Sequence, residues 1–369
     1  MRILMISRDA GILEEGSDVQ KRMAEYGALA DELHIVVFNQ ALNVKSQTVK
    51  ISSNVWAYPT NSRNKWFYIR DAYVVAKQII APRSPLLATS WIVTTQDPFE
   101  TGIVGLLVAR KYRLPLQLQI HTDLFSPYFK NESVINRVRV CIAKFLIPRA
   151  PCIRVVSERI KRSLISHFKL HASRIVVLPI FVDVQKIKDA PVKTDLHKKY
   201  PQFDFVALMA SRFTREKNIP MAISAMVEVV KRHPKAGLII VGSGPEESRL
   251  KLLATHCSLL SHVVFEPWTD DLASYYKTAD VFVLTSHYEG YGRTVLEAEA
   301  GGCPVIMTDV GIAGEIVKHN ENGLVVPVGD TRALIDAIGS VIEKKVIVQA
   351  ALSAQPTKEE YMMQYAAIW

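Results

Sequence analysis

The sequence predicts an α/β protein with two doubly wound parallel sheets, and three observations lead to this fold class. Short runs of β-branched and aliphatic residues alternate with segments whose apolar residues recur at helical spacing. This alternation occurs twice, on either side of a polar, lysine-rich stretch at 183–204. The chain has 369 residues, 49% of them hydrophobic, so it can bury a large core, and its length favours two domains. Because strands that alternate with helices form parallel sheets, we expect two such domains facing a cleft.

The first domain is expected to span 1–182. Four of its segments are typical of buried strands, and the segments between them have the apolar spacing of amphipathic helices. The expected strands are RILMIS, LHIVVF, WIVTTQ and LQLQIH, and two expected helices are VQKRMAEYGALAD and ETGIVGLLVARKY.

The second domain is expected to span 183–354 and to contain a second series of strands with helices between them. These strands are FVALMAS, GLIIVGS, HVVFEP, VFVLTS, CPVIMTD and GLVVPV. The chain then continues into a helix over about 355–369, in which Tyr361, Tyr365 and Trp369 lie four residues apart. This spacing puts the three aromatic rings on one face, and we expect that face to dock or to pack in a core.

Positive charge is concentrated in the first half of the chain. Residues 1–174 carry 25 Lys and Arg against 13 Asp and Glu, whereas the remaining residues are slightly acidic. Within this half, the segment 130–174 has 11 basic and 2 acidic residues, interleaved with Val, Ile, Leu and Phe. This pattern is typical of a helix lying on an anionic surface, and equally of a solvated basic face. Because no helix-turn-helix, zinc-finger or RNA-binding signature accompanies the charge, we do not expect nucleic acid as a partner.

The sequence predicts a soluble cytoplasmic protein. Its longest uncharged apolar runs, such as 102–109, are far shorter than the roughly 18 residues of a membrane-spanning helix. The first residues, MRILMIS, are too short a run for a signal peptide and suit a buried strand. The four cysteines are scattered without a C-x-x-C pair, so we expect them to be reduced and packed.

Two loops of the second domain carry residues suited to an anionic ligand. In an open parallel sheet, ligands bind outside the carboxyl ends of the strands. FVALMAS is followed there by RFTREKN, whose cations Arg212 and Lys217 suggest an anion. GLIIVGS is followed by GPEESRL, in which Gly242 and Gly244 permit a tight turn and close backbone approach. A dinucleotide fingerprint would have a third glycine where this chain has Glu247, which argues against a nicotinamide cofactor.

The third loop, in HYEGYGRTVLEAEAGGCPVI at 287–306, has a glutamate on either side of a glycine pair. Gly290 and Gly292 let the backbone turn, and a helix that starts near Arg293 directs free N–H groups and its positive dipole end toward a phosphate. Glu297, about one turn into this helix, can accept hydrogen bonds from vicinal hydroxyls such as those of a ribose, and Glu289 from those of a second sugar. The three loops together predict a polyhydroxylated ligand with an anionic middle.

These motifs resemble those of the retaining glycosyltransferases of family 4, the glycosyl transferases group 1. EGYGRTVLE matches the family's E-x7-E motif, and SRFTREKN, VGSGPE, LASYYKTADVFVLTS and ENGLVVPVGD resemble other parts of its donor-binding domain. The resemblance implies the GT-B fold, in which two Rossmann-like domains bind the acceptor and the nucleotide-sugar donor. It also implies that the last helix crosses back onto the first domain.

The resemblance also implies roles for individual residues. Arg212 and Lys217 would hold the donor's diphosphate, Glu289 and the amides after it would contact the donor sugar, and Glu297 would take the ribose hydroxyls. The donor-binding residues expected in the second domain are Gly242, Gly244, Gly290, Tyr291, Gly292, Arg293, Thr294 and Glu297.

The first domain resembles the family less tightly. Where family members often have a Gly-Gly pair at the start of helix one, EEGSDVQ has Gly16 followed by Ser17, and we assign Gly16 to the donor site. His121 ends the strand PLQLQIH, where family members carry a histidine near the transferred sugar. We expect it to be catalytic, together with Arg212, Lys217 and Glu289. Asp97 also follows a strand, and it either orients an acceptor or caps the next helix.

The implied reaction is transfer of a hexose from a nucleoside-diphosphate sugar to a hydroxyl acceptor, with retention at the anomeric carbon. No cofactor and no metal are expected, since Asp270 and Asp271 form no D-x-D pair and cations with helix dipoles can stabilise the charge instead. The basic first half adds a further hypothesis. It suggests a lipid or lipid-linked glycan acceptor, as in cell-envelope polysaccharide or glycolipid synthesis, and peripheral contact with the inner membrane face through 130–174.

Two other functions remain open at this point. A sugar-nucleotide epimerase or a phosphorylase could share the fold, and would release epimerised nucleotide-sugar or depend on phosphate. A noncatalytic scaffold that binds nucleotide-sugar is the other alternative. It is disfavoured because a decayed enzyme would be expected to have lost at least one of the charged residues that this chain retains.

Overall fold

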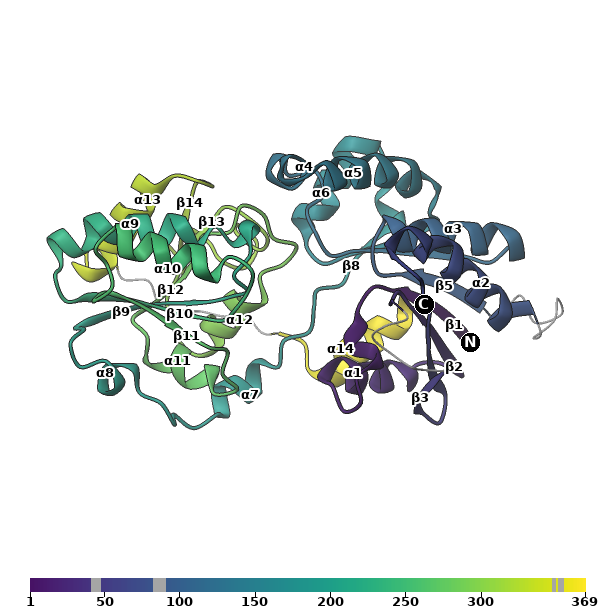
Figure 1. The fold of residues 1–369 in the computed structure, drawn as a ribbon, viewed down its shortest axis with the longest axis horizontal. Coiled ribbons are helices and arrows are strands. Elements are labelled where there is room, and N and C mark those ends of the chain that lie inside the picture. The colour runs from purple at the N-terminus through teal and green to yellow at the C-terminus, as the bar shows by residue number, and fades with distance from the viewer. Residues whose placement is uncertain (41–47, 82–90, 347–349, 351–354) are drawn as a thin grey trace. The chain divides into compact units, whose positions relative to one another are not determined.

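The computed structural model describes residues 1–40, 48–81, 91–346, 350 and 355–369. The chain divides into two compact units, which are described separately below. Unit 1 comprises Met1–Pro179 and Lys358–Trp369, and unit 2 comprises Ile180–Thr357. Each unit is built on one sheet with helices on both faces (Figure 1).

Unit 1 contains an eight-stranded sheet with the order β3-β4-β2-β1-β5-β6-β7-β8. Helices α2, α3 and α5 lie on one face, and α1 and α14 lie on the other (Figure 1). The strands are β1 (Arg2–Ser7), β2 (Glu32–Val37), β3 (Val49–Ser52), β4 (Val55–Pro59), β5 (Trp91–Thr95), β6 (Leu116–Ile120), β7 (Cys152–Val155) and β8 (Ile175–Val177). The helices are α1 (Asp18–Gly27), α2 (Tyr68–Ile80), α3 (Glu100–Tyr112), α4 (Pro127–Glu132), α5 (Val134–Leu146), α6 (Glu158–Phe168) and α14 (Lys358–Ala367).

Unit 2 contains a six-stranded sheet with the order β11-β10-β9-β12-β13-β14, and all its strand pairs are parallel. Helices α9, α10 and α13 cover one face, and α11 and α12 cover the other (Figure 1). The strands are β9 (Phe205–Ala210), β10 (Ala236–Val241), β11 (Val263–Glu266), β12 (Val281–Leu284), β13 (Val305–Thr308) and β14 (Gly323–Val326). The helices are α7 (Val184–Asp189), α8 (Leu196–Lys199), α9 (Ile219–Arg232), α10 (Glu247–His256), α11 (Leu272–Thr278), α12 (Arg293–Ala300) and α13 (Thr331–Ile342).

The predicted fold class is confirmed, and all ten strands predicted from the sequence are present. Their apolar runs become strands because they are buried on both faces, as parallel strands between two helical layers must be. One detail differs from a purely parallel sheet. The edge strand β3 pairs antiparallel with β4, because the two are joined by a short turn that only antiparallel strands can share.

The basic segment 130–174 is not one helix lying on a surface, which corrects the sequence-based interpretation. It contains the end of α4, all of α5, the strand β7 and α6. Arg154 on β7 is buried, and Arg139 on α5 donates hydrogen bonds to Glu100 on α3 at 3.0 Å. Part of the positive charge of this segment therefore belongs to the fold of unit 1. Among the described residues, no helix is long and apolar enough to cross a bilayer.

Helix α14 ends the chain but packs in unit 1, on the same side of the sheet as α1. The ring of Tyr365 stacks on Tyr26 of α1 with centroids 4.4 Å apart, and Trp369 meets Tyr365 edge-on at 4.8 Å. Tyr361 and Tyr365 are both buried. Each such aromatic pair contributes about 0.5–1.5 kcal/mol beyond the area that it buries. The aromatic stripe thus fixes the last helix of the chain to its first.

Candidate functional site

The strand order of unit 2 reverses between β9 and β12, and the loops after these two strands bring together the charged residues predicted from the sequence. In doubly wound sheets, ligands bind at such a switch point. Lys217 follows β9 and Glu289 follows β12, and the Lys217 Nζ atom lies 2.5 Å from Glu289 Oε1. The two side chains are 17% and 12% exposed, so this ion pair is largely removed from water. Ser286 donates a second hydrogen bond to the same carboxylate oxygen, at 2.7 Å.

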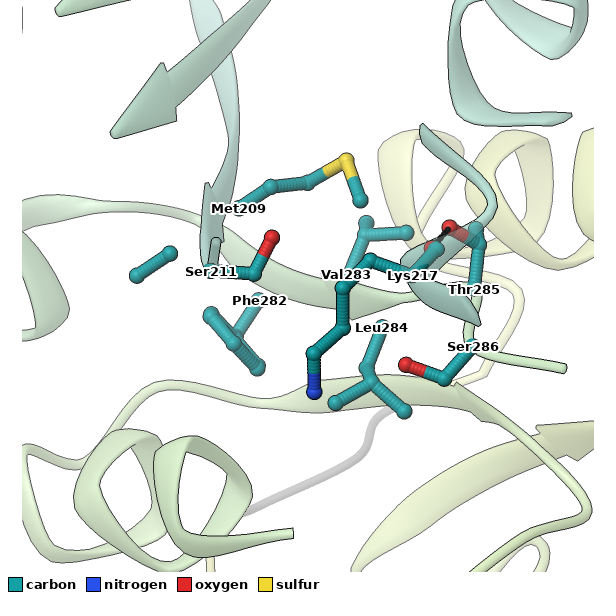
Figure 2. Close-up of a pocket in the computed structure, with 9 residues that line it drawn as sticks. Met209, Ser211, Lys217, Phe282, Val283, Leu284, Thr285 and Ser286 are labelled. Carbon is teal, nitrogen blue, oxygen red and sulfur yellow. Dashed lines mark hydrogen bonds between the residues drawn. The ribbon is translucent and has the colours of Figure 1, made fainter. Parts of the chain in front are cut away.

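A small pocket lies at this switch point, lined by residues of β9, β12 and the loops that follow them. In Figure 2 the Lys217 side chain extends across the pocket, between Ser211 on one side and Ser286 on the other. The loops are held in place by Thr285, whose hydroxyl donates to the carbonyls of Lys217 and Asn218, each at 3.0 Å. The Ser211 hydroxyl oxygen is buried and has no hydrogen-bond partner among the described residues. The pocket therefore presents one ammonium group and one unused hydroxyl.

Gly242 and Gly244 hold the loop after β10 against the loop after β9. Gly242 has φ +144°, and a Cβ atom there would lie 1.9 Å from the carbonyl oxygen of Ser211. Gly244 has φ +158°, and a Cβ atom there would lie 2.5 Å from the carbonyl oxygen of Phe213. No other residue could adopt these positions without moving a backbone. The two glycines predicted to bind the donor thus pack the loop that carries Arg212 and Lys217.

Helix α12 begins at the same edge without a side-chain cap. Its N-cap residue is Gly292, which has φ +104°, a left-handed conformation that favours glycine. Because the N-cap is a glycine, it has no side chain that could accept a hydrogen bond from the first turn. The N–H groups of this turn, which begins with Arg293 and Thr294, can therefore bind an anion. Of the predicted glycine pair, Gly292 alone takes a left-handed φ, and Gly290 is buried.

Glu297 lies in α12 with its carboxylate already oriented. The Tyr276 hydroxyl donates to Glu297 Oε2 at 3.1 Å, and Arg293 Nη2 lies 3.6 Å from Oε1. Burial, and then the negative charge of Glu297, raise the pKa of Tyr276 well above its ordinary value, so its hydroxyl stays protonated and donates. The Glu297 side chain is 16% exposed. It thus keeps one face toward solvent, where it can accept hydrogen bonds from hydroxyl groups.

The other predicted residues of unit 2 differ in exposure. Arg212 is largely exposed, with its Nη2 atom 3.5 Å from Glu216, and its long side chain can reach a ligand outside the pocket. Tyr291 is buried, and its carbonyl accepts a hydrogen bond from Ile312 N at 3.1 Å. Tyr291 therefore fixes the loop before α12.

In unit 1, Gly16 precedes α1 with φ +75°. The next residue, Ser17, caps the helix by accepting a hydrogen bond from Gln20 N at 3.0 Å, and Gln20 Oε1 accepts one from Gly16 N at 3.0 Å. This arrangement resembles a capping box, except that the glutamine accepts from the residue before the N-cap and not from the N-cap itself. The backbone N–H groups of Gly16 and Gln20 therefore already have partners within the chain.

His121 follows β6 and contacts a buried polar network. Its Nε2 atom lies 3.2 Å from Gln119 Oε1, and Arg154 Nη1 donates to the same oxygen at 2.9 Å. Desolvation lowers the pKa of His121 to about 3, and the positive charges of Arg154 and Arg22 contribute to the decrease. His121 is therefore a neutral imidazole at physiological pH.

Asp97 follows β5 but does not cap α3. Its carboxylate accepts a hydrogen bond from Phe99 N at 2.8 Å, whereas α3 begins at Glu100, with Phe99 at its N-cap and no side-chain cap. The carboxylate thus stabilises the turn before the helix. Burial raises the pKa of Asp97, and its hydrogen bonds with Phe99 and Thr101 and the positive charge of Arg8 oppose this increase. The acceptor-side hypothesis for Asp97 stays a prediction.

Sequence reasoning missed several residues that support these side chains. Gln119 is a polar residue in β6, a strand that was predicted from its apolar residues, and Arg154 lies in β7, a strand that was not predicted. Ser286 is a small residue between β12 and Glu289. The sequence LQLQI has a glutamine at every second position, although the strand is buried on both faces. Because buried amides need hydrogen-bond partners, these glutamines could have indicated the polar network around His121.

Two protein-family models match the chain. Glycosyltransferase Family 4 matches residues 28–186, and Glycosyl transferases group 1 matches residues 193–361. Alpha-monoglucosyldiacylglycerol synthase of Streptococcus pneumoniae is 29% identical over 227 residues, which are 58% of this chain and 51% of that protein. This chain therefore spans about half the length of this curated relative.

Solved structures with low sequence identity share the fold over the whole chain. Sucrose-phosphate synthase of Thermosynechococcus elongatus has a TM-score of 0.77 at 20% identity, covering 100% of this chain and 98% of that one. Anabaena Alr3699/HepE in complex with UDP and glucose has a TM-score of 0.70 at 20% identity, covering 100% and 94%. The fold of the chain is therefore GT-B.

Proposed function

The chain belongs to glycosyltransferase family 4, and from this premise we propose that it transfers a hexose from a nucleoside-diphosphate sugar to a hydroxyl group of an acceptor. One observation carries the proposal. At the switch point of unit 2, a largely buried lysine is paired with a glutamate, next to a helix that begins without a side-chain cap. A diphosphate is bound by cations and N–H donors, and a sugar by carboxylates, so this edge of the sheet suits both halves of the donor.

The same groups account for catalysis. When the bond between the anomeric carbon and the diphosphate breaks, negative charge builds on the diphosphate oxygen. The Lys217 ammonium, which is only 17% exposed, and the N–H groups of the first turn of α12 stabilise this charge. Arg212, which is largely exposed, adds a second positive charge at the mouth of the site. Glu289 holds Lys217 in position and binds hydroxyls of the transferred sugar.

Glu297 is assigned to the ribose of the donor. Tyr276 fixes one carboxylate oxygen, so the carboxylate is already oriented before the ribose hydroxyls donate to it. Such prior orientation lowers the entropy cost of binding. The complex of the HepE protein with UDP and glucose supports a nucleoside diphosphate as the leaving group.

We place the reaction among retaining, metal-independent transfers. The acceptor oxygen attacks the anomeric carbon on the face that the diphosphate leaves. The new bond to the acceptor forms as the bond to the diphosphate breaks, and the acceptor proton passes to a diphosphate oxygen. Family resemblance supports retention. The cations Lys217 and Arg212, with the start of α12, supply the charge stabilisation that a metal ion gives in other enzymes.

The experiment is a screen of nucleotide-sugars with lipid and glycan acceptors, in which the product's anomeric configuration is determined by NMR. We expect a glycosylated acceptor whose anomeric configuration matches the donor. Free epimerised nucleotide-sugar, or sugar release that depends on phosphate, would instead indicate an epimerase or a phosphorylase. Donor binding without turnover by any acceptor would indicate a scaffold.

The acceptor is proposed to be a lipid or a lipid-linked glycan, reached from the surface of an anionic membrane. Helix α5 supports this location. Val134, Ile135, Val138 and Phe145 on this helix are 71%, 60%, 53% and 50% exposed, and the helix contains no acidic residue. These side chains are too exposed to stabilise unit 1. Their place on one helix of a basic segment suits insertion between lipid headgroups.

Positive charges border these apolar side chains. Arg137, Lys144 and Arg149 are exposed, and the Arg149 guanidinium lies 3.7 Å from the centre of the Phe145 ring. An anionic bilayer complements both the charge and the apolar surface, with each basic residue near it contributing about 1 kcal/mol. A second copy of the chain would oppose like charges across the same surface, which disfavours self-association there. The name of the Streptococcus pneumoniae relative, alpha-monoglucosyldiacylglycerol synthase, supports a lipid acceptor.

Co-sedimentation with vesicles tests this location. We expect the protein to pellet with phosphatidylglycerol vesicles, less so with phosphatidylcholine, and less again as salt rises. Replacing Ile135 and Val138 by serine should abolish pelleting, whereas serine at Leu252, an equally exposed apolar residue on α10 of unit 2, should not. Unchanged pelleting of the α5 variant would contradict the membrane assignment. A wild type that self-associates without vesicles, while the α5 variant is a monomer, would contradict it too.

A further inference from the structure

Gln119, the second-to-last residue of β6, contacts the imidazole ring of His121. The Gln119 side-chain amide contacts three groups that fix its orientation. Arg154 Nη1 lies 2.9 Å from one end, and since arginine carries only donors, the atom that faces it is the carbonyl oxygen Oε1. The other end, Nε2, donates to Thr94 Oγ1 at 3.0 Å and to the Tyr365 hydroxyl at 3.2 Å. The amide has one orientation that satisfies all three contacts.

This orientation fixes the tautomer of His121. The His121 Nε2 atom lies 3.2 Å from Gln119 Oε1, which only accepts hydrogen bonds. The ring must therefore carry its proton on Nε2. The other ring nitrogen, Nδ1, is left with a lone pair, and no described residue forms a hydrogen bond with it.

We propose that Gln119 and Arg154 are positioning residues, which hold His121 as a neutral imidazole with its proton on Nε2 so that Nδ1 accepts a hydrogen bond from a hydroxyl of the donor sugar. This inference rests on the proposed function for the identity of the ligand. The geometry of the network does not depend on it. His121 then acts as a hydrogen-bond acceptor and gives no proton to the leaving group.

The charged groups around His121 agree with this role. Arg154 on β7 and Arg22 on α1 act on the ring electrostatically, and both are positive, whereas Thr94 of β5 and Tyr365 of α14 are neutral. Among the described residues, no carboxylate pairs with Arg154 or with His121. A second proton on the ring would therefore add a positive charge next to uncompensated positive charges, which is unfavourable.

Arg154 donates hydrogen bonds to residues of unit 1 that lie just before and just after unit 2 in the sequence. Its Nε and Nη2 atoms donate to the carbonyls of Leu178 and Pro179 at 3.2 and 3.1 Å, the last residues of unit 1 before Ile180. Nη2 also donates to the hydroxyl of Tyr361 on α14, at 3.1 Å. The position of Arg154, and through it that of His121, thus depends on residues of unit 1 that precede and follow unit 2 in the sequence.

Nitrogen-15 NMR of the wild-type imidazole tests the inference without any variant. We expect the neutral tautomer protonated on Nε2 throughout pH 5–8. A ring protonated on Nδ1, or one that titrates near pH 6.5, would overturn the proposal. This readout needs no substrate, so a wild-type protein that transfers no sugar would contradict the proposed function and leave the positioning test intact.

Two variants add an activity readout. Gln119→Glu places a negative charge against the ring and should raise the His121 pKa by roughly 1–3 units, so that transfer falls at the acid end of the pH profile. Gln119→Leu should reduce kcat in the wild-type background and cause no further loss in His121→Ala. An equal loss in both backgrounds would mean that Gln119 is only structural, and an unchanged pH profile of Gln119→Glu would also contradict the proposal.

Discussion

Helices α1 of unit 1 and α12 of unit 2 both begin after a glycine with a left-handed φ, yet they differ in what their first turns can bind. Gly16 has φ +75° and Gly292 has φ +104°. In α1, Ser17 and Gln20 take up N–H groups of the helix start, whereas α12 has no side-chain cap. A glycine before a helix therefore does not by itself indicate a phosphate site. The capping side chain and the charge of the first turn also matter, since α1 has Ser17 as its cap and Asp18 in its first turn, and α12 has neither a side-chain cap nor an acidic residue there.

This difference places the main anion site in unit 2. There, the uncapped α12 lies at the same sheet edge as Lys217, so N–H donors and a cation act on one ligand. In unit 1, Ser17 and Gln20 take up two N–H groups, and the carboxylate of Asp18 lies in the first turn of α1, where α12 has no acidic residue. Gly16 therefore stays a proposed donor contact of smaller effect. The following predictions test this difference, beginning with the largest expected effect.

Lys217→Met should reduce the transfer rate by about 100-fold or more, because it removes a preorganised cation from the site of developing negative charge. Turnover with a saturating nucleotide-sugar measures this loss, and circular dichroism checks that the variant is folded. The matched control is Lys251→Met on α10, an exposed lysine that pairs with Glu247 at 2.7 Å. Equal rates for both variants would show that the diphosphate assignment is wrong.

Gly292→Ala and Gly16→Ala form a matched pair. Both place a side chain at a left-handed φ, which costs roughly 1–2 kcal/mol of stability. Neither added Cβ would clash, since the nearest atom is 3.7 Å away at Gly292 and none lies within 4 Å at Gly16. We expect similar losses in urea denaturation, but a clearly larger rise in donor KM for Gly292→Ala. A larger rise for Gly16→Ala would reverse the comparison.

His121 makes unit 1 sensitive to acid. Its pKa is about 3 in the folded protein and about 6.5 when unfolded, so between these values the unfolded state binds more protons. Its contribution to stability is present above pH 6.5 and is lost as the pH falls toward 3. We expect the free energy of unfolding, measured by urea denaturation, to fall less between pH 7 and pH 5 for His121→Gln than for the wild type. An identical pH dependence would mean that His121 is not the group responsible.

Ser17→Ala should have the smallest effect. Loss of this N-cap costs about 1 kcal/mol, measured as a lower melting temperature. Because the α1 cap lies outside the main anion site, donor KM should change little. A tenfold rise in donor KM would show that the start of α1 contributes as much to donor binding as α12 does.

The sequence allowed prediction of the fold and of the main loops because both depend on local patterns. Buried parallel strands are nearly continuous apolar runs, and the loops after them carry Lys217, Glu289 and Gly292 in recognisable motifs. The ion pair between Lys217 and Glu289 was not predicted. It depends on β9 and β12 being neighbours, and strand order is set by the packing of the whole domain.

Strand β7 was not predicted from the sequence, for a different reason. Its centre is Arg154, a residue type that is rarely buried, inside a segment whose charge suggested a surface helix. Burial is possible because Gln119, two tyrosine hydroxyls and two backbone carbonyls accept the guanidinium's hydrogen bonds. These acceptors come from distant parts of the chain, so no local pattern could have identified them.

Calorimetric titration of UDP into the wild type and into Lys217→Met tests the central claim most directly. If the diphosphate lies at the switch point of unit 2, against Lys217 and the first turn of α12, the variant should bind UDP at least tenfold more weakly. Equal dissociation constants for the two folded proteins would contradict the account.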